Sequence, residues 1–434
     1  MRRFSINEIK NRSYLIIPLS CIIIYAFISL IKDNFNPVGA SDFPAFYGAA
    51  KYIFTHPEFV YSERVDPQYP YTPALATILA PLALLPYEIA IWIFLIINVI
   101  LAEIMIILFD EILRLKNVKN KIYRLLFLLV ISNGLRYVQQ FDLLTSKLIT
   151  AFFLILFLKR EIEYRELNKD RSKIKFKFIQ YMYLIFAISI TPQFIFLIFL
   201  YVFYNISLKD LLRIEQIKTY LIIILVFLIQ NFMIFSIIYA DPNSINTFLG
   251  GTWRGRHSPR PLTYSEIVEN RMRLPVDSLT HVFQVLVYYY NIDVDLLIPS
   301  MVIMSIVTII IHLRKNLPLE VKFGFFALFS LFFYTLIALR YYIVILPLIA
   351  ILFINKIEER EEFNEFIKDN FILLIGLFCI VVLYFIPEIH YLLRLFPIFY
   401  NVPIQLLHIR STIVYIILAI TIFFLYRSNR ERII

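Results

Sequence analysis

The chain has 434 residues, of which 60% are hydrophobic and 17% charged, and its mean hydropathy is +0.74. A soluble domain is usually about 45–50% apolar, so this composition excludes an ordinary soluble protein and predicts an integral membrane protein. The net charge of +10 does not predict nucleic-acid binding, because the Lys and Arg residues lie in short loops, where the positive-inside rule expects them.

The apolar runs predict an all-α, polytopic membrane protein that forms a single domain over residues 1–434. The basic N-terminal segment MRRFSINEIKNR and six later charged clusters are best placed inside, so both ends are expected in the cytoplasm. Two short spans are expected to meet at Pro192, where a helix must kink or break. The roughly twelve expected spans are residues 13–31, 88–113, 124–138, 143–158, 178–191, 193–206, 219–240, 295–313, 322–338, 341–355, 370–386 and 412–426.

Residues 72–86, TPALATILAPLALLP, do not fit this topology as a full span. The segment is apolar but short and carries three prolines, and a span here would invert every later loop. We therefore expect a re-entrant or surface-lying helix that packs on protein. This arrangement leaves two large external loops with interfacial helices, at residues 32–87 and 241–294.

The sequence contains no P-loop, GxGxxG, HExxH or CxxC motif that would indicate a known type of catalytic site. In their absence, the residue that stands out chemically is Asp42. Asp42 lies in ASDFPAFYGAAKYI, just after the first apolar run, and aromatic residues follow it. A carboxylate shielded by aromatic rings at the mouth of a helix bundle is suited to act as a general base. The alternative is a loop aspartate that caps a short helix, and the residues alone leave both interpretations open.

Residues 40–100 resemble the opening of the polyprenol-phosphate-mannose-dependent α-mannosyltransferases, the GT87 family of the GT-C membrane glycosyltransferases. The segments SDFPAFYGAAKYI, QYPYTPALATILAPLALLP and IAIWIFLIIN carry the resemblance, and RYYIVILPLIA at 340–350 is similar to a later helix of the class. Two family patterns are incomplete: YVQQFDLL keeps the Gln of a GQxN element but lacks its Asn, and ITPQF lacks the Lys of KPTP. The matching residues are Asp42, Tyr47, Ala49, Ala50, Tyr69, Pro70, Pro73, Leu85, Pro86, Trp92 and Asn98.

The resemblance implies transfer of a sugar, most simply mannose, from a polyprenyl or dolichyl phosphate to a hydroxyl of a lipid or glycan acceptor at the external or periplasmic membrane face. Asp42 would accept the hydroxyl proton as the anomeric carbon is inverted. Asp142 or Glu58 would be the base if Asp42 only caps a helix. No cofactor is required, although carboxylates of the first loop offer an alternative in which they hold a divalent cation.

A leaving phosphate requires cations or hydrogen-bond donors. Arg340 and its neighbour Tyr341 lie between two apolar runs, where an arginine is costly unless it faces a partner or cavity; the alternative is an arginine that snorkels to the interface. The segment TWRGRHSPRP offers a second basic cluster, which can equally be a solvated loop near lipid headgroups. Its candidates are Arg254, Arg256, His257 and Arg260. The residues expected to line the same cleft are Tyr47, Lys51, His56, Gln139, Gln140 and Asp142.

Two other function classes stay open from the sequence. A transporter or flippase of an amphipathic or lipid-linked substrate would also use helices broken at prolines, but it usually places charges within the membrane and shows two related halves. Charged residues are few inside the expected spans, which favours an enzyme acting at one membrane face. A non-catalytic scaffold for envelope assembly is the third possibility.

Overall fold

A computed structural model describes the chain over residues 12–32, 42–62, 64–65, 69, 71–132, 135–166, 174–204, 214–244, 297–314, 317–333, 342–358 and 420. Helices are the only regular secondary structure in these ranges, so the all-α expectation is confirmed for them. The expected span 370–386, nearly all of 412–426 and loop residues 245–294 lie outside the described part of the chain.

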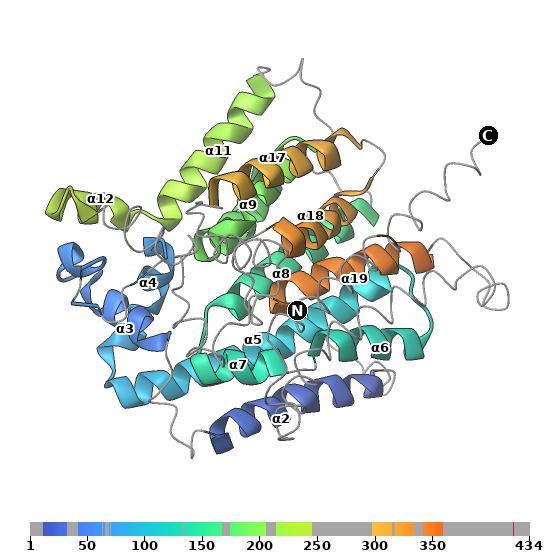
Figure 1. Cartoon of the computed structure of the whole chain (residues 1–434), viewed down its shortest axis with the longest axis horizontal. Helices are drawn as coiled ribbons and strands as arrows, with labels where there is room; N and C mark the ends of the chain where they lie inside the picture. The colour runs from blue at the N-terminus through green and yellow to red at the C-terminus, as the bar shows by residue number, and fades with distance from the viewer. Residues whose placement is uncertain are drawn as a thin grey trace, which may run out of the picture.

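The longest helices pack around one continuous apolar core. Helix α8 (Lys147–Glu166) lies between α5 (Tyr87–Leu115) and α9 (Ile174–Ile190), and α18 (Leu319–Phe333) pairs with α19 (Tyr342–Glu358). Figure 1 shows these helices side by side, with α2 (Ile16–Lys32) along one flank. The remaining described helices are α6 (Lys121–Ser132), α7 (Leu135–Leu143), α10 (Phe196–Val202), α11 (Ile214–Gln230), α12 (Met233–Ala240) and α17 (Leu297–Leu313).

Two described helical segments are long and apolar enough to cross a membrane. They are Ser13–Ile31 and Tyr87–Leu115, and the number rises to four if each of two sharply bent helix pairs forms one span. The outward face of α2 carries exposed Ile16, Ile24 and Phe27, a pattern that a lipid environment tolerates and water does not. The predictions for the first two long spans are therefore confirmed in position.

The expected span 124–138 falls on two described helices, α6, which is described to Ser132, and α7, which is described from Leu135. Residues 133–134 lie outside the described part of the chain. The buried guanidinium of Arg136 donates to the carbonyls of Val130 and Ile131, so it joins the start of α7 to the last described turn of α6. The next helix, α8, begins at Lys147 rather than at residue 143.

The expected span 219–240 is broken, since α11 ends at Gln230 and α12 leaves it at 62°. Asn231 explains the bend, because its buried amide nitrogen donates to the Phe227 carbonyl and to Ser189 Oγ. Its Oδ1 accepts the backbone N–H of Ala74. A side chain that competes for helix carbonyls in this way bends the helix.

Two predictions based on prolines are confirmed. Helix α9 ends at Ile190, a 3-10 turn covers Pro192–Phe194, and α10 follows. Residues 72–86 form only the short α4 (Pro73–Leu79) and a 3-10 turn, Leu82–Leu84, and most side chains of α4 are buried against protein.

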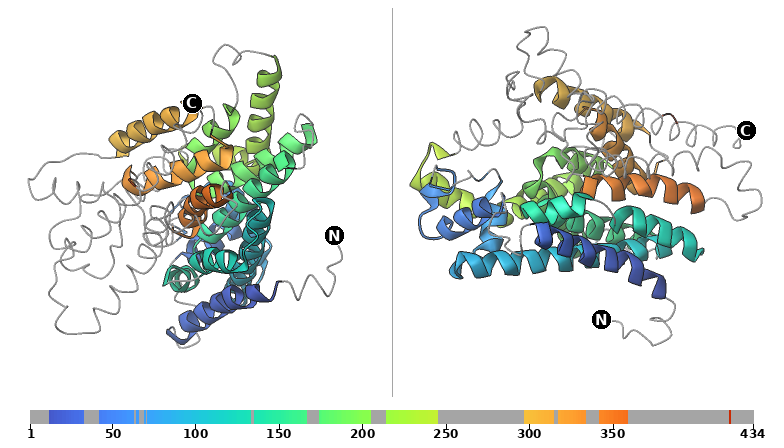
Figure 2. Two further views of the ribbon diagram at one scale, coloured as in Figure 1. Left: turned by 90° about the vertical axis from the view of Figure 1, so that its right-hand side faces the viewer. Right: turned by 60° about the horizontal axis from the view of Figure 1, so that its bottom comes forward.

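Two ends of the bundle can be distinguished by their polar residues. Helices α3 (Phe43–Tyr52), α4 and α12 gather at one end, which we call the Asp42 end (Figures 1 and 2). The opposite end contains Glu320 in the first turn of α18, and we call it the Glu320 end. The residues predicted from the sequence for catalysis and binding lie at the Asp42 end wherever the structure describes them.

Candidate functional site at the turn between α7 and α8

Asp42 occupies the N-cap position of α3, yet its side chain makes no capping hydrogen bond. The residue is 7% exposed, and its backbone N–H donates to the carbonyl of Leu143 at 3.2 Å. A capping aspartate normally accepts from the second or third amide of its helix. The capping interpretation therefore does not account for the carboxylate, and the backbone bond places Asp42 beside the C-terminal residue of α7.

The turn between α7 and α8, residues 144–146, is buried and sharply bent. The two helices meet at 119°, and Leu144 adopts a left-handed backbone conformation with φ 47°. For a non-glycine residue this conformation costs about 1 kcal/mol or more and persists only where surrounding contacts enforce it. Such enforced backbone strain gathers at binding and catalytic sites, which makes the turn a reasonable place to look for one.

Gln140 supplies much of that enforcement. Its Nε2 donates to Asn98 Oδ1 of α5 at 3.0 Å and to the Thr145 carbonyl, while Thr145 Oγ1 donates back to its Oε1. All three side chains are fully buried. Gln140, predicted to line a cleft, thus lies in the interior and ties the turn to α5.

Lys147 is the first residue of α8 and is only 2% exposed. Its Nζ lies 3.4 Å from Thr191 Oγ1, next to the helix break at Pro192, and 5.4 Å from the centre of the Tyr71 ring. Thr191 also shares a 2.7 Å hydrogen bond with Thr150 of α8. A buried ammonium near the end of an apolar helix carries a high desolvation cost and is a marker of function in membrane proteins.

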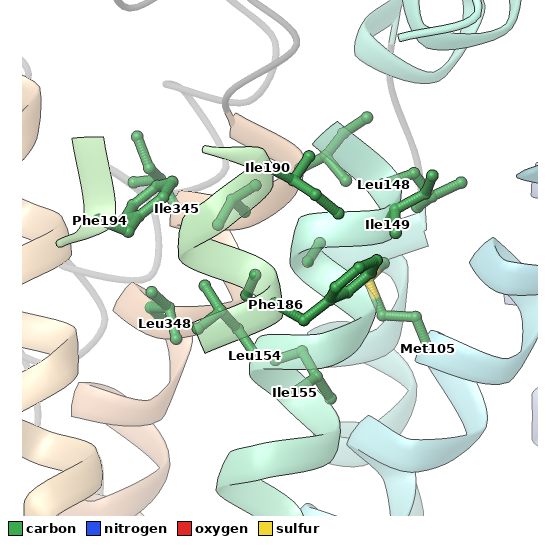
Figure 3. Close-up of a cluster of buried hydrophobic side chains, with 14 of the residues drawn as sticks. Met105, Leu148, Ile149, Leu154, Ile155, Phe186, Ile190, Phe194, Ile345 and Leu348 are labelled. Carbon is green, nitrogen blue, oxygen red and sulfur yellow. The ribbon is translucent and has the colours of Figure 1, made fainter. Parts of the chain in front are cut away.

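Sequence reasoning missed Lys147. The signal was present, because the lysine lies inside the expected apolar span 143–158, where charge is rare. Figure 3 shows its helical neighbours Leu148 and Ile149 packed near Phe186 and Ile190 of α9. Lys147 is therefore followed in the helix by residues of the apolar core and preceded by the polar turn.

Buried tyrosines from the first loop complete this end of the bundle. Tyr61 OH donates to the carbonyl of Tyr71, and Tyr69 OH donates to that of Thr72. Burial raises the pKa of both phenols, so they stay protonated donors. Tyr71 also packs edge-on against Phe46 of α3, which connects the Asp42 helix to the ring facing Lys147.

The remaining predicted residues are distributed around this turn without all converging on it. Tyr47 OH donates to the Leu85 carbonyl at 2.7 Å, and Asp142 accepts from Ser29 Oγ at 3.2 Å. Lys51 and His56 are exposed, and His56 pairs with Glu58 at 3.2 Å. Gln139 lies on α7.

The predicted phosphate-binding residues Arg254, Arg256, His257, Arg260, Arg340 and Tyr341 all lie outside the described part of the chain. Within the described ranges, no group of three or more His, Cys, Asp or Glu side chains is placed to hold a metal ion.

Comparisons with protein-family models, with curated proteins and with solved structures yield no match for this chain.

Proposed function

We propose that the protein is a polytopic membrane glycosyltransferase that transfers a sugar from a polyprenyl-phosphate donor to a hydroxyl of a lipid or glycan acceptor. In this proposal the chain crosses the membrane about twelve times, both termini are cytoplasmic, and the Asp42 end faces outward. The resemblance of residues 40–100 to GT87 mannosyltransferases makes mannose the first sugar to test.

One observation supports the proposal most strongly: Asp42 is buried at a helix N-terminus without capping it. Its backbone N–H donates to the carbonyl of Leu143, the last residue of α7, just before the turn that precedes buried Lys147. Asp42 and Lys147 are thus brought to the same end of the helix bundle, where the proposal places the substrate delivered from the membrane. General-base catalysis requires a positioned carboxylate of this kind.

The reaction proceeds in one inverting step. The acceptor hydroxyl oxygen forms a bond to the anomeric carbon, its proton passes to an Asp42 oxygen, and the bond from that carbon to the phosphate oxygen breaks. The bonding electrons leave with polyprenyl phosphate, which departs as an anion. Cations or hydrogen-bond donors near that oxygen lower the barrier because negative charge accumulates there.

The test is sugar transfer from radiolabelled polyprenyl-phosphate-mannose into total lipid and glycan extract by the purified full-length protein. Asp42→Asn is expected to lower the rate by about 10²–10⁴-fold, the usual contribution of a general base. Asp142→Asn and Glu58→Gln serve as matched carboxylate controls and should retain most activity. Transfer by Asp42→Asn at the wild-type rate would exclude Asp42 as the base, and absence of transfer by the wild type with donors of several sugars would refute the proposal.

A further inference from the structure

The start of α8 carries unused hydrogen-bonding capacity in a buried setting. The Ser146 carbonyl accepts the N–H of Thr150 at 3.2 Å, so Ser146 is the N-cap residue of the helix. Its hydroxyl is fully buried, and no described group hydrogen-bonds to it. A serine at this position normally caps the second or third amide of its helix, and here it does not.

The backbone of the same helical turn is also rich in donors. The first amides of any helix lack partners within the helix. In α8 the Lys147 N–H donates to Thr145 Oγ1 at a long distance, 3.4 Å. The next two residues, Leu148 and Ile149, are buried. Amide donors and the positive end of the helix dipole favour an anion at such a terminus.

A cation belongs to this same turn. The Lys147 side chain extends toward Thr191 and over the face of Tyr71. The donors contributed by this end of α8 are therefore an ammonium, a serine hydroxyl and backbone amides. A tetrahedral oxyanion with several acceptor oxygens fits this set, because charge-assisted hydrogen bonds to a phosphate are among the strongest in proteins.

We infer that Ser146, Lys147 and the first turn of α8 form a binding site for a phosphate group, and that the group is the monophosphate of the lipid carrier. The inference rests on the proposed function for the identity of the lipid. It is independent of the basic residues predicted from the sequence, and it adds a cation whose backbone is only a few residues from Leu143, the partner of Asp42.

The site also fits the proposed reaction. An inverting step requires the acceptor oxygen to attack from the side of the anomeric carbon opposite the departing phosphate. In the proposed arrangement the phosphate is held at the start of α8, with the ammonium near the departing oxygen. Asp42, whose backbone N–H donates to the carbonyl of Leu143 only a few residues before α8, accepts the proton of the acceptor. Lys147 in this role both binds the donor and stabilises the leaving group.

The direct test measures binding of the lipid phosphate in the absence of sugar transfer. The full-length protein in nanodiscs is titrated with radiolabelled undecaprenyl monophosphate, and phosphate-free undecaprenol and inorganic phosphate are added as competitors. Lys147→Met is expected to weaken binding of the monophosphate at least tenfold, whereas Lys147→Arg retains most of it. Lys322→Met is the matched control, because Lys322 is equally buried but donates to the His312 carbonyl elsewhere in the bundle; it should bind as the wild type does.

Three results would overturn the inference. They are unchanged binding by Lys147→Met, equally strong competition by undecaprenol, and competition by inorganic phosphate as strong as that of the lipid phosphate, which would show that the tail adds nothing. If Lys147→Met fails to give a monodisperse protein, Ser146→Ala decides. It should weaken binding several-fold, and binding at the wild-type level would count against the site.

The outcome is separable from that of the transfer assay. Asp42→Asn should bind undecaprenyl monophosphate normally while losing transfer. Lysine-dependent binding by a protein that transfers no sugar would preserve the phosphate site and refute the glycosyltransferase. If transfer depends on Asp42 but undecaprenyl monophosphate binding does not depend on Lys147, the glycosyltransferase proposal stands and the phosphate site is refuted.

Discussion

The two ends of the bundle treat buried polar groups in opposite ways. At the Glu320 end, Lys116 Nζ lies 2.9 Å from Glu320 Oε1, and Arg165 Nη1 donates to Glu320 Oε2 at 2.7 Å. At the Asp42 end, the network around Gln140 consists of neutral amides and hydroxyls. Lys116 and Lys147 are both almost fully buried. Lys116 contacts the carboxylates of Glu166 and Glu320, and the contacts of Lys147 include the Thr191 hydroxyl and the Tyr71 ring.

This difference indicates a structural role for the Glu320 end and a functional role for the Asp42 end. The charges at the Glu320 end compensate one another and join the segment after α5 to α8 and α18. We therefore interpret them as a structural clamp. The neutral network at the Asp42 end holds a bent turn with one strained residue, Leu144. The hydrogen bonds of this network hold the turn in a fixed geometry. A fixed geometry is required to position a carboxylate and a cation around a substrate.

The largest expected effect on stability comes from breaking the clamp. Glu320→Gln removes the carboxylate that faces Lys116 and Arg165 and leaves buried positive charge, which typically costs about 3–5 kcal/mol. Gln140→Leu, at the other end, leaves Asn98 and Thr145 without their partner and should cost about 1–3 kcal/mol. Thermal unfolding in one detergent ranks the two variants, and a lower melting temperature for Gln140→Leu would reverse the comparison.

A smaller contrast is expected between two glycines. A Cβ at Gly324 would lie 2.7 Å from Leu352 Cδ2 and 2.8 Å from the Leu348 carbonyl oxygen, which belongs to the backbone of α19. Gly324→Ala should therefore separate α18 from α19 at a cost of about 1–3 kcal/mol.

Gly48→Ala, in α3, is the matched control. The added methyl would meet only the Val65 side chain, at 3.1 Å, and alanine has the higher helix propensity by about 1 kcal/mol. Its melting temperature should stay close to that of the wild type. If both alanine variants melted together, the close approach of α18 and α19 would not limit stability.

The sequence predicted those parts of the fold that local patterns determine. Apolar length predicted α2 and α5, and Pro192 predicted the break after α9. The bend at Asn231 was not predictable in this way, because its cause is a set of contacts with Ala74 and Ser189, far away in the chain.

In the candidate site, too, local patterns predicted some features and tertiary contacts determined others. Asp42 was found from its own neighbourhood, an acidic residue followed by aromatics. Its placement beside the turn between α7 and α8 required a bond across about a hundred residues, to Leu143. Lys147 could have been identified from the sequence as a charge within an apolar run. Its proximity to Thr191 and Tyr71 depends on tertiary contacts, which the sequence pattern does not show.

The smallest effect is expected from the exposed pair at the rim of the Asp42 end. His56 and Glu58 have side chains that are 57% and 33% exposed and lie 3.2 Å apart, so water screens their attraction and the pair contributes about 0–1 kcal/mol. His56→Ala should leave both the melting temperature and undecaprenyl monophosphate binding unchanged. A clear loss of binding in this variant would mean that the ligand also reaches the exposed first loop, and that the site extends from the buried turn at α8 outward past α3.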